Sequence, residues 1–268
     1  MPVAVVIPCY NEEDALPHLA ATLKAVRTSL QPRYAPTFIF VNDGSTDNTA
    51  ILLQELFGPC PDCEVTHLPQ NIGIAGAILA GIRQTKAEVV CSIDSDCSYD
   101  PRELASMIPL LHENVHVVTA SPYHPNGGVL DVSSWRLWLS RTASAMYRRV
   151  LHHKLATYTS CFRVYRRCAV ADLPITDSRF AGVAEILGRL DLLGAHIVEY
   201  PTTLRARTSG QSKMKLCRTV FAQLAVLVRL ICIRWFHPSV SSLRITSVTS
   251  VATVIEANPH QKHQEQTF

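Results

Sequence analysis

Short apolar runs alternate with helical repeats along the first hundred residues of the chain. Strands are predicted at residues 3–7, 37–41, 64–68 and 89–93, and all of these except the third are runs of apolar or β-prone residues. The first three are followed by apolar residues at helical spacing, in segments that run to about residue 30, from residue 46 or 47, and through residue 87. This alternation predicts an α/β fold with a mostly parallel sheet flanked by helices, and with the turns after the strands at one edge of that sheet.

The fourth strand runs directly into two carboxylates, Asp94 and Asp96, and Asp100-Pro101 predicts the start of the next helix. Ligands of open α/β sheets bind at the carboxyl ends of strands. Two neighbouring carboxylates repel each other there unless a cation is bound, and Mg²⁺ prefers one or two carboxylates together with water and phosphate oxygens. An isolated Asp-x-Asp is more often a simple turn, so the neighbouring turns decide between the two interpretations.

Those turns carry further polar groups. Tyr10 follows the first strand and Asp43 the second, while Asn71 and Gly73 precede the third helix. The glycine spacing matches neither the dinucleotide fingerprint nor the P-loop, which weakens a redox or ATP-hydrolysing function. Asp43-Gly44-Ser45 also suits ordinary turn chemistry. The hypothesis that remains is a nucleotide-sized crevice in which Tyr10 stacks, Asp43 accepts from a base N–H, and the carboxylate pair holds a metal ion against phosphates.

Four segments together resemble the catalytic domain of glycosyltransferase family 2, which has the GT-A (Rossmann-like) fold. They are Ile7-Pro8-Cys9-Tyr10-Asn11-Glu12, Val41-Asn42-Asp43-Gly44-Ser45, Asn71-Ile72-Gly73 and Asp94-Ser95-Asp96. The resemblance implies that a nucleotide-sugar donor is held by Pro8, Tyr10, Glu12, Asp43, Asn71 and Gly73. It implies Mg²⁺ or Mn²⁺ on the sugar diphosphate, with Asp96 as the first-choice ligand, Ser98 beside it, and Asp94 orienting the donor or binding through water.

The second half of the chain is similar to the dolichol-phosphate mannose synthase branch of this family, so that the resemblance covers about residues 3 to 215. This branch transfers a sugar to a polyprenyl phosphate at the cytoplasmic membrane face. Acceptor or phosphate contacts are implied for Arg136, Ser140, Ser160, Arg163, Ser212 and Lys213, and catalytic contacts for Asp94, Asp96, Glu185 and Arg207. The chain departs from the branch at Asn42, Thr157 and Cys161, and at Ser121-Pro122-Tyr123, where one phosphate-binding arginine is missing.

A metal-dependent, inverting transferase follows from these residues, with a UDP- or GDP-sugar as donor. A phosphate acceptor is already ionised and needs no general base, whereas a hydroxyl of a glycan or lipid-linked sugar needs one, for which Glu185 is the candidate. Arg207 and Lys213 lie on a glycine-containing stretch that is expected to close over the diphosphate. The alternatives are a transferase to such a hydroxyl and a non-catalytic nucleotide-binding subunit.

The chain divides into a catalytic domain at residues 1–213, a helix at 214–237 and a polar tail at 238–268. Lys215, Arg218, Gln223, Arg229 and Arg234 fall within one half of the second segment's helical wheel, so an amphipathic helix is expected to lie on a membrane or pack against the domain. Its charges argue against a membrane span. Residues 132–154 interleave Trp135, Trp138, Leu139, Met146 and Val150 with arginines, which suits either an interfacial helix or an ordinary domain helix with a basic face.

Composition adds three constraints. With 268 residues, of which 47% are hydrophobic and 18% charged, the chain can bury a full core. The net charge of +3 is too small to decide for or against nucleic acid, no nucleic-acid partner is expected, and the sequence does not reveal the oligomeric state. Nine scattered cysteines suit buried apolar positions better than disulfides, and the pair Cys60 and Cys63 lacks partners for a zinc site. Pro2 leads directly into a strand without a signal sequence, so a cytoplasmic protein, peripheral on the inner membrane face, is expected.

Overall fold

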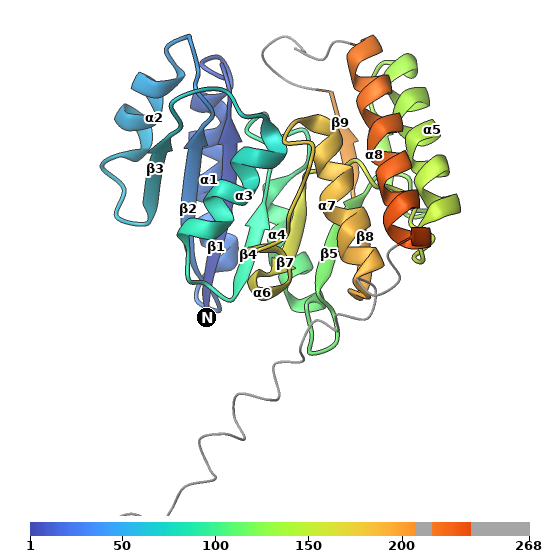
Figure 1. The fold of residues 1–268 in the computed structure, drawn as a ribbon. Helices are drawn as coiled ribbons and strands as arrows, with labels where there is room; N and C mark the ends of the chain where they lie inside the picture. Colours follow the sequence, from blue (N-terminus) through green and yellow to red (C-terminus); the bar gives the residue numbers. More distant parts are fainter. Residues whose placement is uncertain (207–215, 237–268) are drawn as a thin grey trace, which may run out of the picture.

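A seven-stranded sheet forms the centre of the computed structural model, which describes residues 1–206 and 216–236 (Figure 1). The strand order is β3-β2-β1-β4-β7-β5-β8, and β7 runs antiparallel to both of its neighbours while the other pairs are parallel. The strands are β1 (Pro2–Cys9), β2 (Ala35–Asn42), β3 (Cys63–His67), β4 (Val89–Ser92), β5 (Val117–Ser121), β7 (Arg163–Arg166) and β8 (Ile197–Pro201). A separate parallel pair joins β6 (Gly128–Leu130) to β9 (Thr203–Arg205). The predicted mostly parallel α/β sheet is confirmed.

Helices follow most strands, as the hydrophobic pattern predicts. They are α1 (Leu16–Leu30), α2 (Thr49–Phe57), α3 (Ile74–Gln84), α4 (Leu104–Met107), α5 (Ser134–Val150), α6 (Arg167–Val170), α7 (Phe180–Leu192) and α8 (Leu216–Phe236), with 3₁₀ turns η1 (Pro101–Glu103) and η2 (Ile108–Leu110). Asp100 accepts from the backbone N–H of Arg102, which confirms the predicted N-cap. α3 ends before the predicted residue 87, because Thr85 is extended and its hydroxyl accepts from the N–H of Ala87.

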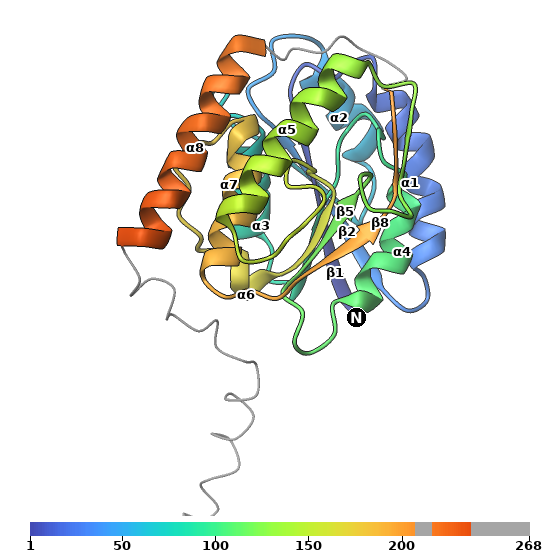
Figure 2. The same cartoon turned by 90° about the vertical axis from the view of Figure 1, so that its right-hand side faces the viewer.

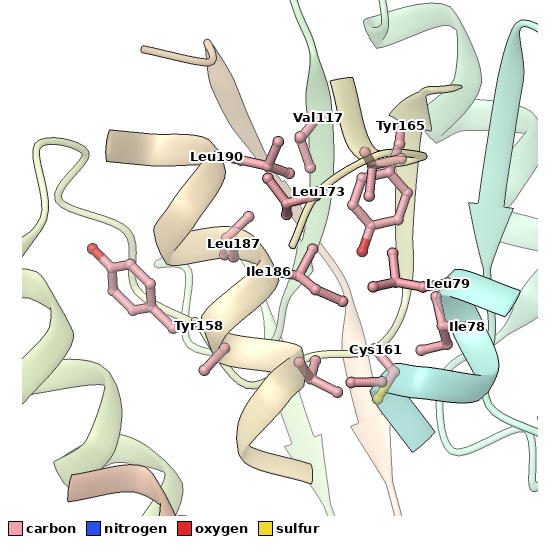
Figure 3. Close-up of a cluster of buried hydrophobic side chains, with 14 of the residues drawn as sticks. Ile78, Leu79, Val117, Tyr158, Cys161, Tyr165, Leu173, Ile186, Leu187 and Leu190 are labelled. Carbon is pink, nitrogen blue, oxygen red and sulfur yellow. The ribbon is translucent and has the colours of Figure 1, made fainter. Parts of the chain in front are cut away.

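Both faces of the sheet are buried, which explains why the central strands read as continuous apolar runs. In β1, Val3, Val5 and Ile7 face one core with α1, α2 and α4, whereas Ala4 and Val6 face another core with α3, α6 and α7. The alternation follows from the two-residue period of a strand. Figure 3 shows part of the second core, in which Ile186, Leu187 and Leu190 of α7 lie among side chains of the sheet and of α3.

α5 and α8 lie side by side at the edge of the molecule, next to α7, in both views (Figures 1 and 2). Tyr147 of α5 and Leu230 of α8 are buried in this layer, and Leu230 packs where Gly188 of α7 leaves room. The aromatic and apolar residues predicted for this helix lie in two different environments in α5. Trp135 and Trp138 are exposed, but Leu139, Met146 and Val150 turn toward a cavity or the core.

α8 turns Gln223 inward together with apolar side chains, whereas Arg218 and Arg229 of its polar half stay exposed. Gln223 is buried beside Val226 and Leu230, while Phe221, Leu224, Val228 and Trp235 point outward with 72%, 40%, 57% and 74% of their surface exposed. The segment Arg218–Phe236 is long and apolar enough to cross a membrane by length and composition alone. Packing against the domain, one of the two predicted arrangements, is what the structure shows. The predicted boundary between residues 213 and 214 and the tail at 238–268 lie outside the described residues.

Candidate active site

Two adjoining cavities open at the carboxyl ends of the parallel strands. The larger cavity has a volume of about 1010 Å³ and the smaller about 420 Å³. Pockets for nucleotide-sized ligands fall in this range. Four residues line both cavities, and they are Asp94, Arg136, Phe180 and Thr219. A ligand in one cavity therefore meets a ligand in the other next to the carboxylate of Asp94.

The larger cavity is built from turns that follow β1, β2 and β3. The structure brings all six residues predicted for the nucleotide to its wall, which are Pro8, Tyr10, Glu12, Asp43, Asn71 and Gly73. Their common position follows from parallel pairing, because β1 pairs with β2 on one side and β4 on the other, and β2 pairs with β3. The predicted edge of the sheet is therefore where the side chains meet.

Asp43 organises this wall through bonds within the chain. Its carboxylate accepts from the backbone N–H of Ile72 at 2.7 Å, from that of Gly73 at 2.8 Å, and from the side-chain amide of Asn71 at 3.0 Å. Burial raises the pKa of Asp43, and the bonds from Ile72 and Gly73 offset part of that rise. The carboxylate thus holds the turn after β3 in place, in addition to any contact with a ligand.

Gly73 allows this turn to approach the loop before α7. Its φ of +99° lies in the region that side chains rarely adopt, and an added Cβ would come within 2.7 Å of the carbonyl oxygen of Ser178. The hydroxyl of Ser178 in turn donates to the carbonyl of Ile72. Close contact between the two loops closes the wall of the larger cavity.

The carboxylate pair lies where the cavities join. Asp96 is buried, at 5% exposed, and accepts from the backbone N–H of Ser98 at 2.9 Å across a tight turn in which Cys97 has a φ of 54°. Burial raises the pKa of the Cys161 thiol well above its ordinary value, and the nearby charge of Asp94 adds to that effect. Cys161 therefore lies next to a site of negative charge.

Two carboxylates at the meeting point of the cavities fit a Mg²⁺ or Mn²⁺ ion that completes its shell with water and phosphate oxygens. Among the described residues, no group of three or more His, Cys, Asp and Glu side chains could hold a metal ion by itself. The donor set therefore suits an ion that arrives with a phosphorylated ligand better than an all-protein cage. Asp94 and Asp96 are the residues that would hold it.

The smaller cavity contains four more of the predicted residues. Ser98, Arg136, Ser140 and Ser160 line it, and Ser140 shares a hydrogen bond of 2.8 Å with Thr159. Three of the four positions at which the sequence departs from the dolichol-phosphate mannose synthase branch, namely Pro122, Thr157 and Cys161, also line this cavity. The departures therefore gather on one side of the site.

Two predicted site residues line neither cavity. Arg163 is fully buried in β7, where its guanidinium donates to the carbonyls of Val183 and Tyr158 at 2.7 and 2.8 Å. These bonds satisfy a buried cation but leave the predicted phosphate contact without access. Arg207, Ser212 and Lys213 lie outside the described residues.

Glu185 is the second residue away from the cavities. It is fully buried in α7, accepts from the N–H groups of Thr176 and Asp177, and pairs with Arg189 at 2.7 Å. Its carboxylate supports the loop that carries Arg179 into the larger cavity. Glu185 therefore lies outside both cavities, beneath this loop.

Several wall residues escaped the sequence analysis. Asp177 and Arg179 precede α7, and Arg218, Thr219 and Gln223 come from α8. The loop before α7 carries a charge-rich signal, Asp177-Ser178-Arg179, directly ahead of a helix. The α8 residues carry no local signal, because only the packing of α8 on α7 brings them to the site.

Comparison with known proteins identifies the family. Residues 4–173 match the model of glycosyl transferase family 2. The polyprenol monophosphomannose synthase of Mycolicibacterium smegmatis is 30% identical over 217 residues, which are 78% of this chain and 80% of that protein. The undecaprenyl-phosphate 4-deoxy-4-formamido-L-arabinose transferase of Pseudomonas paraeruginosa is 29% identical over 81% of this chain, which spans 61% of that longer protein. The predicted resemblance to the dolichol-phosphate mannose synthase branch is confirmed.

Solved structures support the fold. The glucosyl-3-phosphoglycerate synthase of Mycobacterium tuberculosis, solved with Mg²⁺ and UDP, superposes with a TM-score of 0.62 at 20% identity, covering 87% of this chain and 79% of the synthase. Another structure of it, with Mn²⁺, UDP and glucosyl-3-phosphoglycerate, gives a TM-score of 0.59 at 19% identity over the same shares of the two chains. At this identity the likeness shows the GT-A type of fold. With its matched sequence, its sheet and its paired cavities, the chain belongs to glycosyl transferase family 2 and is a glycosyltransferase.

Proposed function

We propose that this enzyme transfers a sugar from a UDP- or GDP-sugar to a polyprenyl phosphate, in a metal-dependent reaction that inverts the anomeric centre. The observation that carries the proposal is the junction at Asp94, which lines both cavities together with Arg136. Two relatives support this class of acceptor. One is named as a polyprenol monophosphomannose synthase, and the other as a transferase with undecaprenyl phosphate in its name.

The larger cavity suits the nucleotide. Tyr10 offers an aromatic face, and backbone and side-chain groups around Asp43 and Asn71 offer polar contacts for a base and ribose. Arg179 and Arg218 place two cations on the same wall, where a diphosphate would need them. The donor would then extend from Tyr10 toward Asp94, with its sugar at the junction.

The smaller cavity suits the acceptor head group. Its wall carries hydroxyl groups from Ser98, Ser140 and Ser160 and the guanidinium of Arg136. An acceptor phosphate oxygen attacks the anomeric carbon from this side, the bond from that carbon to the diphosphate breaks, and the nucleoside diphosphate leaves with the electron pair. One displacement inverts the centre, and no base is needed because the phosphate is already ionised.

A divalent ion, once bound with the donor, would neutralise charge on the leaving diphosphate. Asp94 and Asp96 would hold it, and the N–H of Ser98 would fix the carboxylate of Asp96. The structural relatives solved with Mg²⁺ or Mn²⁺ and UDP support this assignment.

The outward face of α8 supports a location on the inner membrane surface. Phe221, Leu224, Val228 and Trp235 form an exposed apolar stripe, and Trp135 and Trp138 of the adjacent α5 are exposed as well. Arg141, Arg148 and Arg149 of α5 are exposed beside them. Aromatic rings and arginines in this combination suit the boundary of an anionic lipid layer, where a polyprenyl phosphate would present its head group.

A direct assay tests the function. Purified enzyme with Mn²⁺ is expected to transfer sugar from at least one UDP- or GDP-sugar to a short polyprenyl phosphate, and to release the matching nucleoside diphosphate. Product stereochemistry, read by NMR coupling at the anomeric proton, is expected to be inverted. Absence of transfer from every UDP- and GDP-sugar to this acceptor would overturn the proposal.

A transferase to a hydroxyl group is the alternative, and Glu185 separates the two. Because Glu185 lies under the loop before α7, Glu185→Gln is expected to lower turnover only moderately, about threefold to tenfold, while it also lowers stability. Abolished turnover with unchanged nucleotide binding would instead favour a general base and a hydroxyl acceptor.

Liposome sedimentation tests the membrane location. The wild-type enzyme is expected to sediment with anionic liposomes, and the double variant Phe221→Ser and Trp235→Ser to lose most of that binding. Ile51→Ser is a matched control, since Ile51 is also exposed, at 58%, but lies on α2. Equal binding by all three proteins would exclude the α8 face as the membrane contact.

A further inference from the structure

The polar half of α8 reaches the smaller cavity through Gln223. This residue is 8% exposed and lines the cavity together with Thr219, one turn earlier on the same helix. A glutamine is a costly residue to bury, and the neighbouring apolar residues Val226 and Leu230 would pack equally well beside a leucine. The amide at this position therefore calls for a partner.

One half of the amide has a partner and the other half does not. The hydroxyl of Tyr147 in α5 donates to the side-chain oxygen of Gln223 at 2.5 Å and lies 3.3 Å from its backbone carbonyl. These bonds fix the orientation of the amide. The Nε2 atom is buried and makes no hydrogen bond with any described residue. A buried N–H group without an acceptor is rare, and a ligand in the cavity can supply that acceptor.

A second donor in the same cavity shares this property. The Nε atom of Arg136, on α5, is also buried and unbonded among the described residues. The two helices thus each place one residue with an unsatisfied N–H donor in the wall of the same cavity. Oxygen atoms of an anionic group, and a phosphate monoester above all, match two such donors and the hydroxyl groups around them.

We propose that Gln223 binds the phosphate group of the acceptor by donating its Nε2 hydrogen to a phosphate oxygen, with Tyr147 holding the amide in the required orientation. The proposal rests on the proposed function and adds to it a residue that selects phosphate acceptors. It also gives α8 a place in the site, because the helix that carries the outward apolar stripe carries this donor on its inward side.

Gln223→Glu is the sharpest test, because it keeps the shape and the oxygen that accepts from Tyr147 but replaces the donor with an oxygen. We expect the KM for a short polyprenyl phosphate to rise about tenfold to a hundredfold, while the KM for the donor and the Kd for nucleotide with Mn²⁺ stay within about twofold. Inhibition by the corresponding polyprenol, which lacks the phosphate, is expected to keep its inhibition constant, which separates the phosphate from the lipid chain.

Two further variants separate binding from structure. Tyr147→Phe breaks the same hydrogen bond but leaves the Nε2 donor, so its acceptor KM is expected to rise less than that of Gln223→Glu. Gln54→Glu makes the identical change on the exposed face of α2 and is expected to leave every constant unchanged. Gln223→Met, uncharged and of similar length, replaces Gln223→Glu in the test if thermal melting shows that the charge unfolds the protein.

The outcomes separate the role of Gln223 from the use of polyprenyl phosphate as acceptor. If the wild-type enzyme transfers sugar to polyprenyl phosphate but Gln223→Glu and Gln223→Met keep the wild-type acceptor KM, the assignment of Gln223 is wrong and the proposed function stands. An equal rise for Tyr147→Phe and Gln223→Glu would reduce Gln223 to a packing role. If the wild-type enzyme does not use polyprenyl phosphate at all, the proposed function fails and this inference fails with it.

Discussion

The two cavities of the site are built in different ways. Much of the wall of the larger cavity comes from turns that directly follow β1, β2 and β3, and it is held by short contacts such as those of Asp43 to Ile72 and Gly73. Most of the wall of the smaller cavity comes from α5, α8, the segment 157–161 and the loop after β4, which lie in different parts of the chain. Tertiary packing alone brings these elements together. The larger cavity thus depends mainly on local turns at strand ends, and the smaller cavity mainly on the packing of helices.

Buried carboxylates hold both halves together, but their surroundings differ. Asp43 lies at the end of a strand, where burial raises its pKa by more than the hydrogen bonds from Ile72 and Gly73 lower it. Asp191 of α7 accepts from the N–H groups of His152 and His153 and from the ring of His153, and so ties the end of α5 to α7. Burial raises the pKa of Asp191 too, but its bonds to His153 and His152 more than offset this and leave the pKa lowered. The helical layer is thus anchored by an ionised group.

The largest effect is expected at the junction that both cavities share. Asp96→Asn keeps an oxygen for the N–H of Ser98 but removes the charge that would hold the metal ion. Turnover is expected to fall about a hundredfold to a thousandfold, with a matching rise in the Mn²⁺ concentration needed for half activity. Asp100→Asn, four residues away at the start of η1, is the control and is expected to keep near-normal turnover. Normal activity of Asp96→Asn would exclude the carboxylate pair as the metal site.

The next effect tests whether the halves act separately. Asp43→Asn puts an NH₂ group against the N–H of Ile72 or Gly73, so the wall of the larger cavity loses its anchor. The nucleotide Kd, measured by calorimetry with Mn²⁺, is expected to rise about tenfold or more, while the acceptor KM changes little. Asp172→Asn, at an exposed position, serves as the control. A parallel rise in both constants would show that the two cavities are coupled.

A smaller effect is expected in the pH dependence of stability. Because the folded-state pKa of Asp191 is lowered, its contribution is present above the unfolded value of about 4 and is lost as pH falls through the folded pKa. The raised pKa of Asp43 gives the opposite sign, a contribution present below about 4 and lost as pH rises through the folded pKa. Urea unfolding between pH 3 and 7 is expected to show that Asp191→Asn removes the first slope and Asp43→Asn the second. If the free energy of unfolding depended on pH in the same way in both variants, the opposite pKa shifts of Asp191 and Asp43 would be contradicted.

The smallest effect is expected for Ser98→Ala. The hydrogen bond to Asp96 runs from the backbone N–H of Ser98, which the substitution keeps. The Mn²⁺ requirement is therefore expected to change less than about threefold. A change as large as that of Asp96→Asn would instead make the hydroxyl of Ser98 a direct metal ligand, as the family resemblance implies.

The sequence alone determined the architecture and much of the wall of the larger cavity. Apolar runs between helical repeats predicted the sheet, and turns at strand ends predicted the positions of Tyr10, Asp43 and Asp94, because parallel pairing carries such turns to one edge of a sheet. These signals are local, and each lies within a few residues of a strand that is easy to recognise.

Tertiary structure decided the smaller cavity and placed two predicted site residues outside both cavities. Arg163 and Glu185 carry charges that suit a site, but their burial and hydrogen bonds show that they support β7 and the loop before α7. α8 was expected to lie on a membrane or pack against the domain, and the structure buries Gln223 beside Val226 and Leu230 while Phe221 and Trp235 face outward. A helical wheel shows which residues share a face, but only packing against α7 and α5 determines where that face points.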